Sequence, residues 1–280
     1  MNLPKPTPES ATVDLASAYA RALYHACGIE VASHDPRPKV GIASSWSELV
    51  PGHVHLNQLA RSVAEGVCDA GGVPLPFQTI ALCDGICQGA GGNAVLPSRE
   101  VIAASVELTA RAYSLDALVC LASCDKIVPG MLLAAARLDV PTIFVTGGLM
   151  AEGEWQGRRM VASDVKEGIG RANRGEITQE ELRLLEQAAC PGIGVCNMMG
   201  TANSVCTAVE AAGLSLPGNA TLPATRSGEI NPDLLILAQR AGRCIVRALV
   251  DGTTFRQVVR PAVLRNLVAV IQAIGGSTNM

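Results

Sequence analysis

The chain has 280 residues, of which 49% are apolar and 17% charged, so it should bury a sizeable core rather than remain disordered. Its formal net charge of −3 argues against nucleic acid as the main partner. No apolar run reaches membrane-spanning length and the N-terminus shows no signal-peptide core, which together predict a cytoplasmic protein with no membrane partner.

Apolar patterns then predict the elements in chain order. Residues 12–27 repeat apolar side chains at helical spacing, and we interpret residues 1–38 as an N-terminal helical arm. An α/β domain over residues 39–280 follows. Its alternation of strands and helices predicts a parallel sheet with helices on both faces. The expected strands are 39–45, 77–83, 116–122 and 141–147, and the expected helices between them are 54–72, 98–114 and 129–138.

After residue 148 the pattern changes. Residues 149–177 are polar and glycine-rich, which predicts a surface excursion. We expect a helix-rich segment after it, with little strand. Its helical patterns lie at 178–189, 201–213, 232–250 and 254–274.

Ten cysteines are spread through these patterns. A reducing compartment disfavours disulfides, so most of the cysteines should be small buried core residues. The exceptions should lie in glycine- and proline-rich turns, where a side chain can point into a cleft. Three such turns are ALCDGICQGAGG (81–92), SCDKIVPG (123–130) and ACPGIGVCNMMGTANS (189–204).

These turns carry two kinds of metal ligand. Cys124 and Cys196 are soft ligands suited to an iron–sulfur cluster or zinc, whereas Asp84 and Asp125 are hard oxygen ligands of the kind that magnesium prefers. In proteins with a parallel sheet, bound molecules and ions usually lie just outside the carboxyl ends of the strands. The alternative is that each Asp caps a helix and each Cys fills space, because the sequence has no C-x-x-C pair or ferredoxin run.

Two histidines offer a further metal hypothesis. His53 and His55, in PGHVHL (51–56), could bind zinc. Histidines near a helix start are more often structural or substrate-facing. Zinc is therefore the weaker hypothesis.

Several segments in order resemble one family. From about residue 39 to the end, the sequence resembles the dihydroxy-acid dehydratase and phosphogluconate dehydratase family. That resemblance is far more specific than any single motif. The segments are VPGHVHL, LPSREVIA, CDKIVPGMLLAAARLDVPTIFVTGG, GTANSVCTAVEAAGLSLPGNATLPA and GGSTNM.

The resemblance implies an iron–sulfur cluster next to a magnesium ion. Cys124 and Cys196 match the family's cluster ligands in its CDK motif and its GxC turn. Asp84, Asp125 and a carbamylated Lys126 match its magnesium ligands, and Lys126 is our catalytic candidate. A neutral lysine amine that takes up CO₂ becomes an anionic oxygen ligand.

The sequence departs from one branch of the family. Members with a [2Fe–2S] cluster have a Pro-Cys turn after the first strand, where this sequence has Pro51–Gly52. It therefore resembles the oxygen-sensitive members that carry [4Fe–4S]. Cys83 is a candidate third thiolate. Successive side chains at a strand end tend to point apart, however, and this argues against Cys83 and Asp84 facing the same site.

The implied reaction is loss of water from a 2,3-dihydroxy carboxylic acid, which gives a 2-keto acid. VPGHVHL and LPSRE favour a branched-chain dihydroxy acid as the substrate. CDG and the following Gln88 favour a sugar acid such as gluconate or xylonate. From another class altogether, the chain could be a non-catalytic iron–sulfur or partner-binding module.

The resemblance covers only the family's N-terminal portion. The family's base, a serine, and a glutamate of its magnesium site lie in a C-terminal region that no segment here matches. We expect the family's β-rich second domain to be absent as well. We expect the α/β domain to be truncated at its C-terminal end and the apolar face of 262–274 to lack cover. An exposed face of that kind predicts either a homo-oligomer or a separate subunit bearing the C-terminal half.

Overall fold

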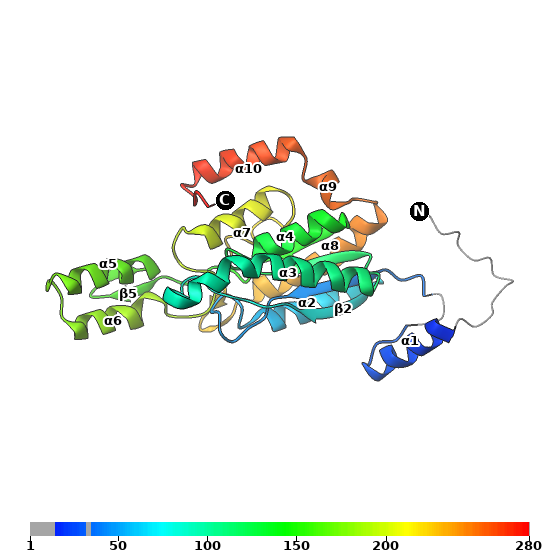
Figure 1. Ribbon diagram of the computed structural model, residues 1–280, viewed down its shortest axis with the longest axis horizontal. Helices are drawn as coiled ribbons and strands as arrows, with labels where there is room; N and C mark the ends of the chain where they lie inside the picture. The colour runs from blue at the N-terminus through cyan, green and yellow to red at the C-terminus, as the bar shows by residue number, and fades with distance from the viewer. Residues whose placement is uncertain (1–14, 32–34, 280) are drawn as a thin grey trace. The chain divides into compact units, whose positions relative to one another are not determined.

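The protein is represented by a computed structural model that describes residues 15–31 and 35–279 (Figure 1). The chain divides into two units, Met1–Arg37 and Pro38–Met280. The first unit contains helix α1, Leu15–Ala26. The expected helix over 12–27 agrees with α1 where both are described, and its first residues lie outside the described part of the chain.

A four-stranded parallel sheet forms the centre of the second unit. Its strands lie in the order β2-β1-β3-β4 and are parallel throughout. Every residue of β3 is buried, as expected for a central strand covered on both faces. The four strands are β1 (Lys39–Ser44), β2 (Val73–Gln78), β3 (Ala117–Leu121) and β4 (Thr142–Val145).

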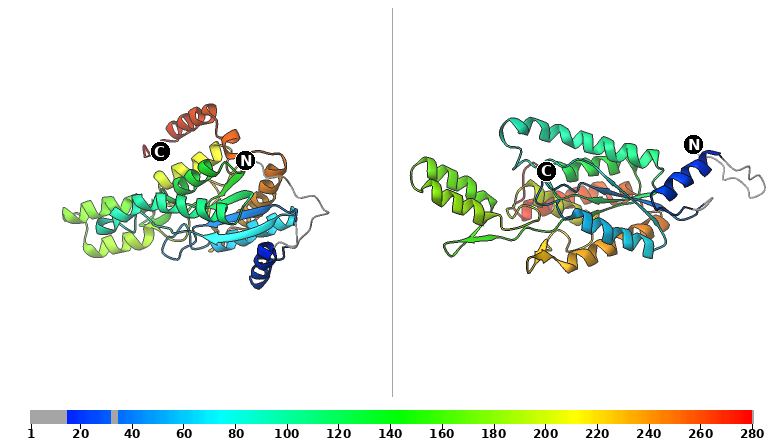
Figure 2. Two further views of the ribbon diagram at one scale, coloured as in Figure 1. Left: turned by 45° about the vertical axis from the view of Figure 1, so that its right-hand side comes forward. Right: turned by 90° about the horizontal axis from the view of Figure 1, so that it is seen from below.

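Two pairs of helices sandwich this sheet. α2 (Leu56–Asp69) and α8 (Pro232–Val250) pack on one face, and α3 (Gly92–Ala112) and α4 (Ile127–Leu138) lie on the other, as the right-hand view of Figure 2 shows. The α/β fold with helices on both faces of a parallel sheet is therefore confirmed. Helices also dominate the later part of the chain, as expected.

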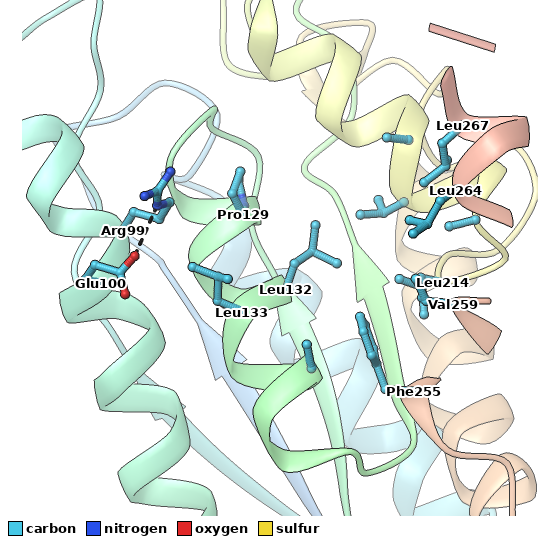
Figure 3. Close-up of a pocket in the computed structure, with 14 residues that line it drawn as sticks. Arg99, Glu100, Pro129, Leu132, Leu133, Leu214, Phe255, Val259, Leu264 and Leu267 are labelled. Carbon is cyan, nitrogen blue, oxygen red and sulfur yellow. Dashed lines mark ion pairs between the residues drawn. The ribbon is translucent and has the colours of Figure 1, made fainter. Parts of the chain in front are cut away.

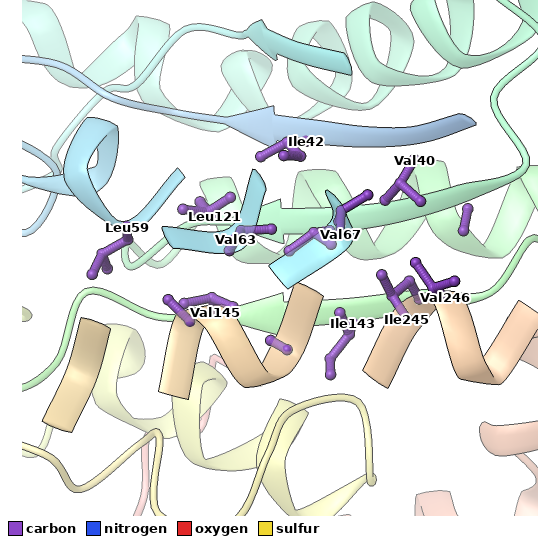
Figure 4. Packing of buried hydrophobic residues seen from close by; sticks show 14 of the residues in the cluster. Val40, Ile42, Leu59, Val63, Val67, Leu121, Ile143, Val145, Ile245 and Val246 are labelled. Carbon is purple, nitrogen blue, oxygen red and sulfur yellow. The ribbon is translucent and has the colours of Figure 1, made fainter. Parts of the chain in front are cut away.

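The core between the sheet and the α2–α8 pair is aliphatic (Figure 4). Burial of each such side chain stabilises the fold by about 1.5–3 kcal/mol. Because the side chains come from three strands and two helices, they fix the sheet against both helices at once. The cluster includes Val40, Ile42, Leu59, Val63, Val67, Leu121, Val145, Ile245 and Val246.

Glycines let α2 and α8 approach until their backbones touch. A Cβ atom on Gly66 would lie 1.9 Å from the carbonyl oxygen of Gln239, and one on Gly242 would lie 2.2 Å from that of Val63. Real Cβ atoms do not come this close to backbone. Both positions therefore require glycine for packing, and the cost of glycine in a helix is offset by close contact.

The expected second strand, 77–83, is wrong in position. β2 begins at Val73 and ends at Gln78, because Val73 and Leu75 supply the buried alternation. Residues 79–83 are irregular, and α3 begins at Gly92 rather than near residue 98. Asp84 therefore does not directly follow a strand.

Residues 149–177 contain elements that the sequence patterns did not predict. A hairpin of β5 (Gly153–Trp155) and β6 (Arg158–Met160) leads into α5 (Ala162–Asn173), which packs on α6 (Gln179–Ala189). Met160, Leu185 and Ala189 form a small core there. The hairpin was missed because its strands are only three residues long, and α5 was missed because its sequence, ASDVKEGIGRAN, is mostly polar and glycine-rich.

The expected helix 254–274 is two helices. α9 (Phe255–Val258) ends before Pro261, which opens α10 (Pro261–Ala273) as its first residue. α10 packs against α7 (Thr201–Ala211), but among the described residues none in α10 is buried, which confirms the expected lack of cover. The remaining short elements are η1 (Gly89–Gly91), β7 (Thr225–Arg226) and β8 (Glu229–Ile230).

Membrane-spanning segments are not found among the helices of the described residues, since none is long and apolar enough to cross a membrane.

The α2–α8 contact makes a direct prediction about stability. Gly242→Ala should lower the free energy of unfolding by about 1–3 kcal/mol, because the added methyl must push the two backbones apart. Gly170→Ala is the matched control, since a Cβ there would meet only a side-chain atom of Arg174 at 3.7 Å and alanine favours helix. Urea denaturation checks both; equal stability of the two variants would contradict the contact.

Candidate functional site

Turns that carry the predicted site residues meet at the carboxyl end of the sheet. Ser45 follows β1 and donates its backbone N–H to Leu121, the last residue of β3. Ala122 in turn donates to Val145, the last residue of β4, over 3.4 Å. The three strands thus end at one level, as ligand sites of parallel sheets require.

An Asp–Lys–Asp cluster lies at this edge. Lys126 immediately precedes α4, and its Nζ lies 3.2 Å from Oδ2 of Asp84 and 3.1 Å from Oδ2 of Asp125. The side chains of Lys126 and Asp125 are 18% and 12% exposed, so water screens this cluster less than it would a surface ion pair. The structure therefore brings together all three residues predicted to bind magnesium.

The charges in the cluster perturb one another. Burial, followed by the hydrogen bond with Asp84, raises the pKa of Asp125. Burial lowers the pKa of Lys126, but the Asp125 and Asp84 carboxylates more than offset this, so its pKa is raised overall. Lys126 is accordingly a cation in this arrangement.

Two oxygens of the cluster are well suited to a divalent cation. Oδ1 of Asp84 and Oδ1 of Asp125 are buried and have no hydrogen-bond partner among the described residues. Buried acceptors of this kind are costly unless they are paired. Among the described residues no group of three or more His, Cys, Asp or Glu side chains is arranged to bind a metal. A site made of two aspartates and a lysine contains only two residues of those types. The residues present fit magnesium.

Three thiols lie beside this cluster. Cys83 and Cys124 are both buried, and interaction with the Cys124 thiol lowers the pKa of Cys83 to about 6. The same interaction, with burial, raises the pKa of Cys124 well above its usual value. Burial is the main cause of the raised pKa of Cys196, and the charge of Cys83 is the second cause. The Cys196 thiol therefore lies within electrostatic range of Cys83. Thiols are the donors that an iron–sulfur cluster takes, although among the described residues these three do not already form a metal-binding arrangement.

Cys196 is held by the start of α7. The amide of Asn203 donates to the carbonyl oxygens of Cys196 at 2.6 Å and Met198 at 2.7 Å. Gly194, two residues before Cys196, has φ +130°, which glycine adopts readily. Asn203 was missed by sequence reasoning because nothing in its spacing distinguishes it from a helix surface residue.

Both histidines of PGHVHL are buried and bind backbone. A ring nitrogen of each lies against a carbonyl oxygen: Nδ1 of His53 is 2.7 Å from Ser45, and Nε2 of His55 is 2.6 Å from Gly147. These contacts give both histidines a structural role, as expected if they do not bind zinc. Each ring keeps its second nitrogen buried and without a partner among the described residues.

The expectation that most of the cysteines are core residues is wrong, and Cys87 is only partly buried. Cys120 and Cys206 are buried, and burial raises the pKa of each to about 12. Four others are exposed, two on the solvent side of helices and two just beyond helix ends. They are Cys27, Cys68, Cys190 and Cys244.

A cavity of about 400 Å³ adjoins the Asp–Lys–Asp cluster. Asp84 and Lys126 line it with charged groups, Gln88 with an amide, and Val95 and Leu96 with aliphatic side chains. This volume suits a small organic acid.

A larger groove of about 510 Å³ lies elsewhere, between α3, α4, α7, α9 and α10 (Figure 3). Leu132 of α4 faces Leu264 and Leu267 of α10 across it, and Leu133 lines it on the side of α3. Pro129 is the one described lining residue that belongs to a cysteine turn, and the groove shares no lining residue with the cavity beside the Asp–Lys–Asp cluster. The two hollows are therefore separate.

Comparison with known proteins gives the family. The family described as dihydroxy-acid/6-phosphogluconate dehydratase N-terminal matches residues 37–280, and the chain belongs to it. Dihydroxy-acid dehydratases from Pyrococcus abyssi and Methanospirillum hungatei are 44% and 45% identical to it, over 92% and 95% of this chain. The one from Moorella thermoacetica is 44% identical over 95%. The matches cover 46%, 48% and 47% of those relatives, so the chain spans about half the length of each.

The buried histidines predict a loss of stability in acid. Burial lowers the pKa of His53 to about 4, whereas in the unfolded chain it is near 6.5, so the unfolded state binds more protons between these values. The free energy of unfolding should therefore fall as the pH drops, by about 2 kcal/mol from this residue at pH 5. Urea denaturation at pH 7.5 and pH 5 measures the difference.

Two variants isolate the contribution of His53. His53→Gln should reduce the pH difference, whereas His25→Gln, whose ring is 77% exposed, should leave it unchanged. A pH difference equal in wild type and His53→Gln would show that His53 is not held neutral.

Proposed function

We propose that this chain provides the iron–sulfur and magnesium ligands of a dehydratase that converts a 2,3-dihydroxy carboxylic acid to a 2-keto acid. The observation that carries the proposal is the meeting of three thiols and an Asp–Lys–Asp cluster at one sheet edge. The relatives' name, dihydroxy-acid dehydratase, supports the substrate class. Because the chain spans about half of each relative, we assign the activity to an assembly with the remaining half.

The ligand assignment follows the chemistry of the donors. Cys124 and Cys196, with Cys83 as the third thiolate, would hold the cluster, and [4Fe–4S] is favoured over [2Fe–2S] by glycine at position 52. Asp84 and Asp125, with Lys126, would hold magnesium. When bound, the two groups would supply Lewis-acid chemistry that stabilises negative charge on the substrate's oxygens.

Lys126 is the catalytic candidate because its protonation state controls the magnesium ligand set. Uptake of CO₂ by its amine forms an N–C bond and releases a proton, so it requires the neutral amine. Asp84 and Asp125 hold Lys126 as a cation, and the carbamate can therefore form only when their charge is compensated.

The cavity beside the cluster favours a branched-chain dihydroxy acid. Val95 and Leu96 offer an aliphatic wall for an alkyl group, in keeping with the relatives' name. A sugar acid is the second candidate, because the amide of Gln88 also lines the cavity and can bind a hydroxyl group.

Cysteine variants test the cluster site. After anaerobic reconstitution with iron and sulfide, Cys124→Ser and Cys196→Ser should lose the brown colour and most bound iron, because the hydroxyl of serine is a poor ligand for this soft metal site. Cys83→Ser should lose iron as well if it is the third ligand. Cys244→Ser is the matched control, since Cys244 is exposed on α8. Full iron content in both Cys124→Ser and Cys196→Ser would rule out the site.

Turnover tests the function as a whole. The reaction breaks the C2–H and C3–O bonds, and a missing general base typically costs about 10²–10⁴ in rate. The reconstituted chain with magnesium should therefore form 2-keto acid poorly alone, and efficiently when co-expressed with a polypeptide corresponding to the relatives' second half. Branched-chain dihydroxy acid and gluconate should be compared as substrates.

The controls of this assay separate three outcomes. Lys126→Arg in the complex should abolish turnover while leaving the iron content unchanged, because arginine forms no carbamate ligand. Robust turnover by the chain alone would show that it contains its own base. A complex with full iron content that converts neither substrate would favour the non-catalytic iron–sulfur module.

A further inference from the structure

A short loop between β1 and α2 contacts both cysteine turns. Gly194 donates its N–H to the carbonyl oxygen of Pro51 over 3.0 Å. A Cβ atom on Gly52 would lie 3.2 Å from the carbonyl oxygen of Gly194 and 3.3 Å from Cβ of Ser123. The loop is therefore packed between the turn that precedes Cys196 and the turn that precedes Cys124.

His55 connects this loop to the end of β4. Its side chain is 2% exposed, and its Nε2 donates to the carbonyl oxygen of Gly147 over 2.6 Å. Since a carbonyl only accepts, the ring must carry its proton on Nε2. The contact joins residues 92 positions apart in sequence, so it is a tertiary contact.

The carbonyl that His55 binds belongs to the peptide between Gly147 and Gly148. Gly147 donates its N–H to Oγ of Ser123 over 2.7 Å, next to Cys124. The carbonyl oxygen of Gly148 accepts from the N–H of Val195 over 2.8 Å, next to Cys196. One pair of glycines thus holds the neighbours of both cysteines.

We propose that His55 is a positioning residue that fixes the Gly147–Gly148 peptide and thereby sets the separation of the Cys124 and Cys196 thiols. Two consecutive glycines have little conformational preference of their own, and Gly148 has φ +74°. Without the donor from His55, the buried carbonyl of Gly147 would lack its partner and the peptide could turn. The part of the inference that concerns a cluster rests on the proposed function, whereas the backbone contact does not.

Amide hydrogen exchange of the metal-free chain tests the contact. His55→Leu should speed exchange of peptides containing Gly147 and Val195 by about tenfold, the factor expected for one hydrogen bond. Peptides from β1 should exchange as in the wild type. His55→Gln should restore slow exchange, because its amide can donate to the same carbonyl, and His25→Leu in the first unit is the control. If His55→Leu leaves both peptides unchanged, the proposal is wrong.

Ser123→Ala gives a second route if His55→Leu exposes the whole sheet to exchange. It removes the acceptor of the Gly147 N–H with little change in volume, and exchange at Gly147 should again be about tenfold faster. Unchanged exchange at Gly147 in Ser123→Ala would contradict the network.

Iron and sulfide content after anaerobic reconstitution tests the consequence for the thiols. His55→Leu should bind less than half the iron of the wild type, and His55→Gln should bind nearly as much as the wild type. Normal iron content in His55→Leu, together with faster exchange, would overturn the positioning role. If the wild type itself bound no iron, the proposed function would fail, and exchange would still decide whether His55 fixes the peptide.

Discussion

The register of three parallel strands is the constraint on which the candidate site depends. Ser44 of β1 pairs with Leu121 of β3, and Leu121 pairs with Val145 of β4. The next residue of each strand therefore begins a turn at the same level. Serines and glycines follow there because backbone from several turns must approach closely, and only then can thiols and carboxylates from distant segments meet.

This edge is held by the apolar core beneath it rather than by its own polar groups. Asp84 and Asp125 bring like charges together, and each has a buried oxygen without a partner among the described residues. Such an arrangement is unfavourable by itself, since only one lysine compensates two carboxylates. It persists because the buried core between the sheet and α2–α8 fixes the strand ends independently of the site. Stability from the core thus offsets the unfavourable placement of charged groups at the site.

The sequence predicted what depends on local pattern and missed what depends on tertiary contact. Periodicity located β1, β3, β4 and most helices, and the residue types of Asp84, Asp125 and Lys126 indicated a cluster that the fold then assembles. β2 was misplaced because the apolar run at 77–83 continues beyond the strand. The contact between His55 and Gly147 carries no local signal, since a histidine that binds a carbonyl 92 residues away looks like any other.

The misplaced strand also affects the argument about the third thiolate. The objection to Cys83 was that successive side chains at a strand end point apart, but β2 ends at Gln78 and Cys83 lies in irregular chain beyond it. There its thiol lies close enough to Cys124 for the two to shift each other's pKa, that of Cys83 downward and that of Cys124 upward. At Gly52, by contrast, even a Cβ would be only 3.2 Å from Gly194 and 3.3 Å from Ser123, so a cysteine would need the two turns to move apart. Close packing of the loop therefore disfavours a thiolate at position 52, whereas the strand-end objection no longer applies to Cys83.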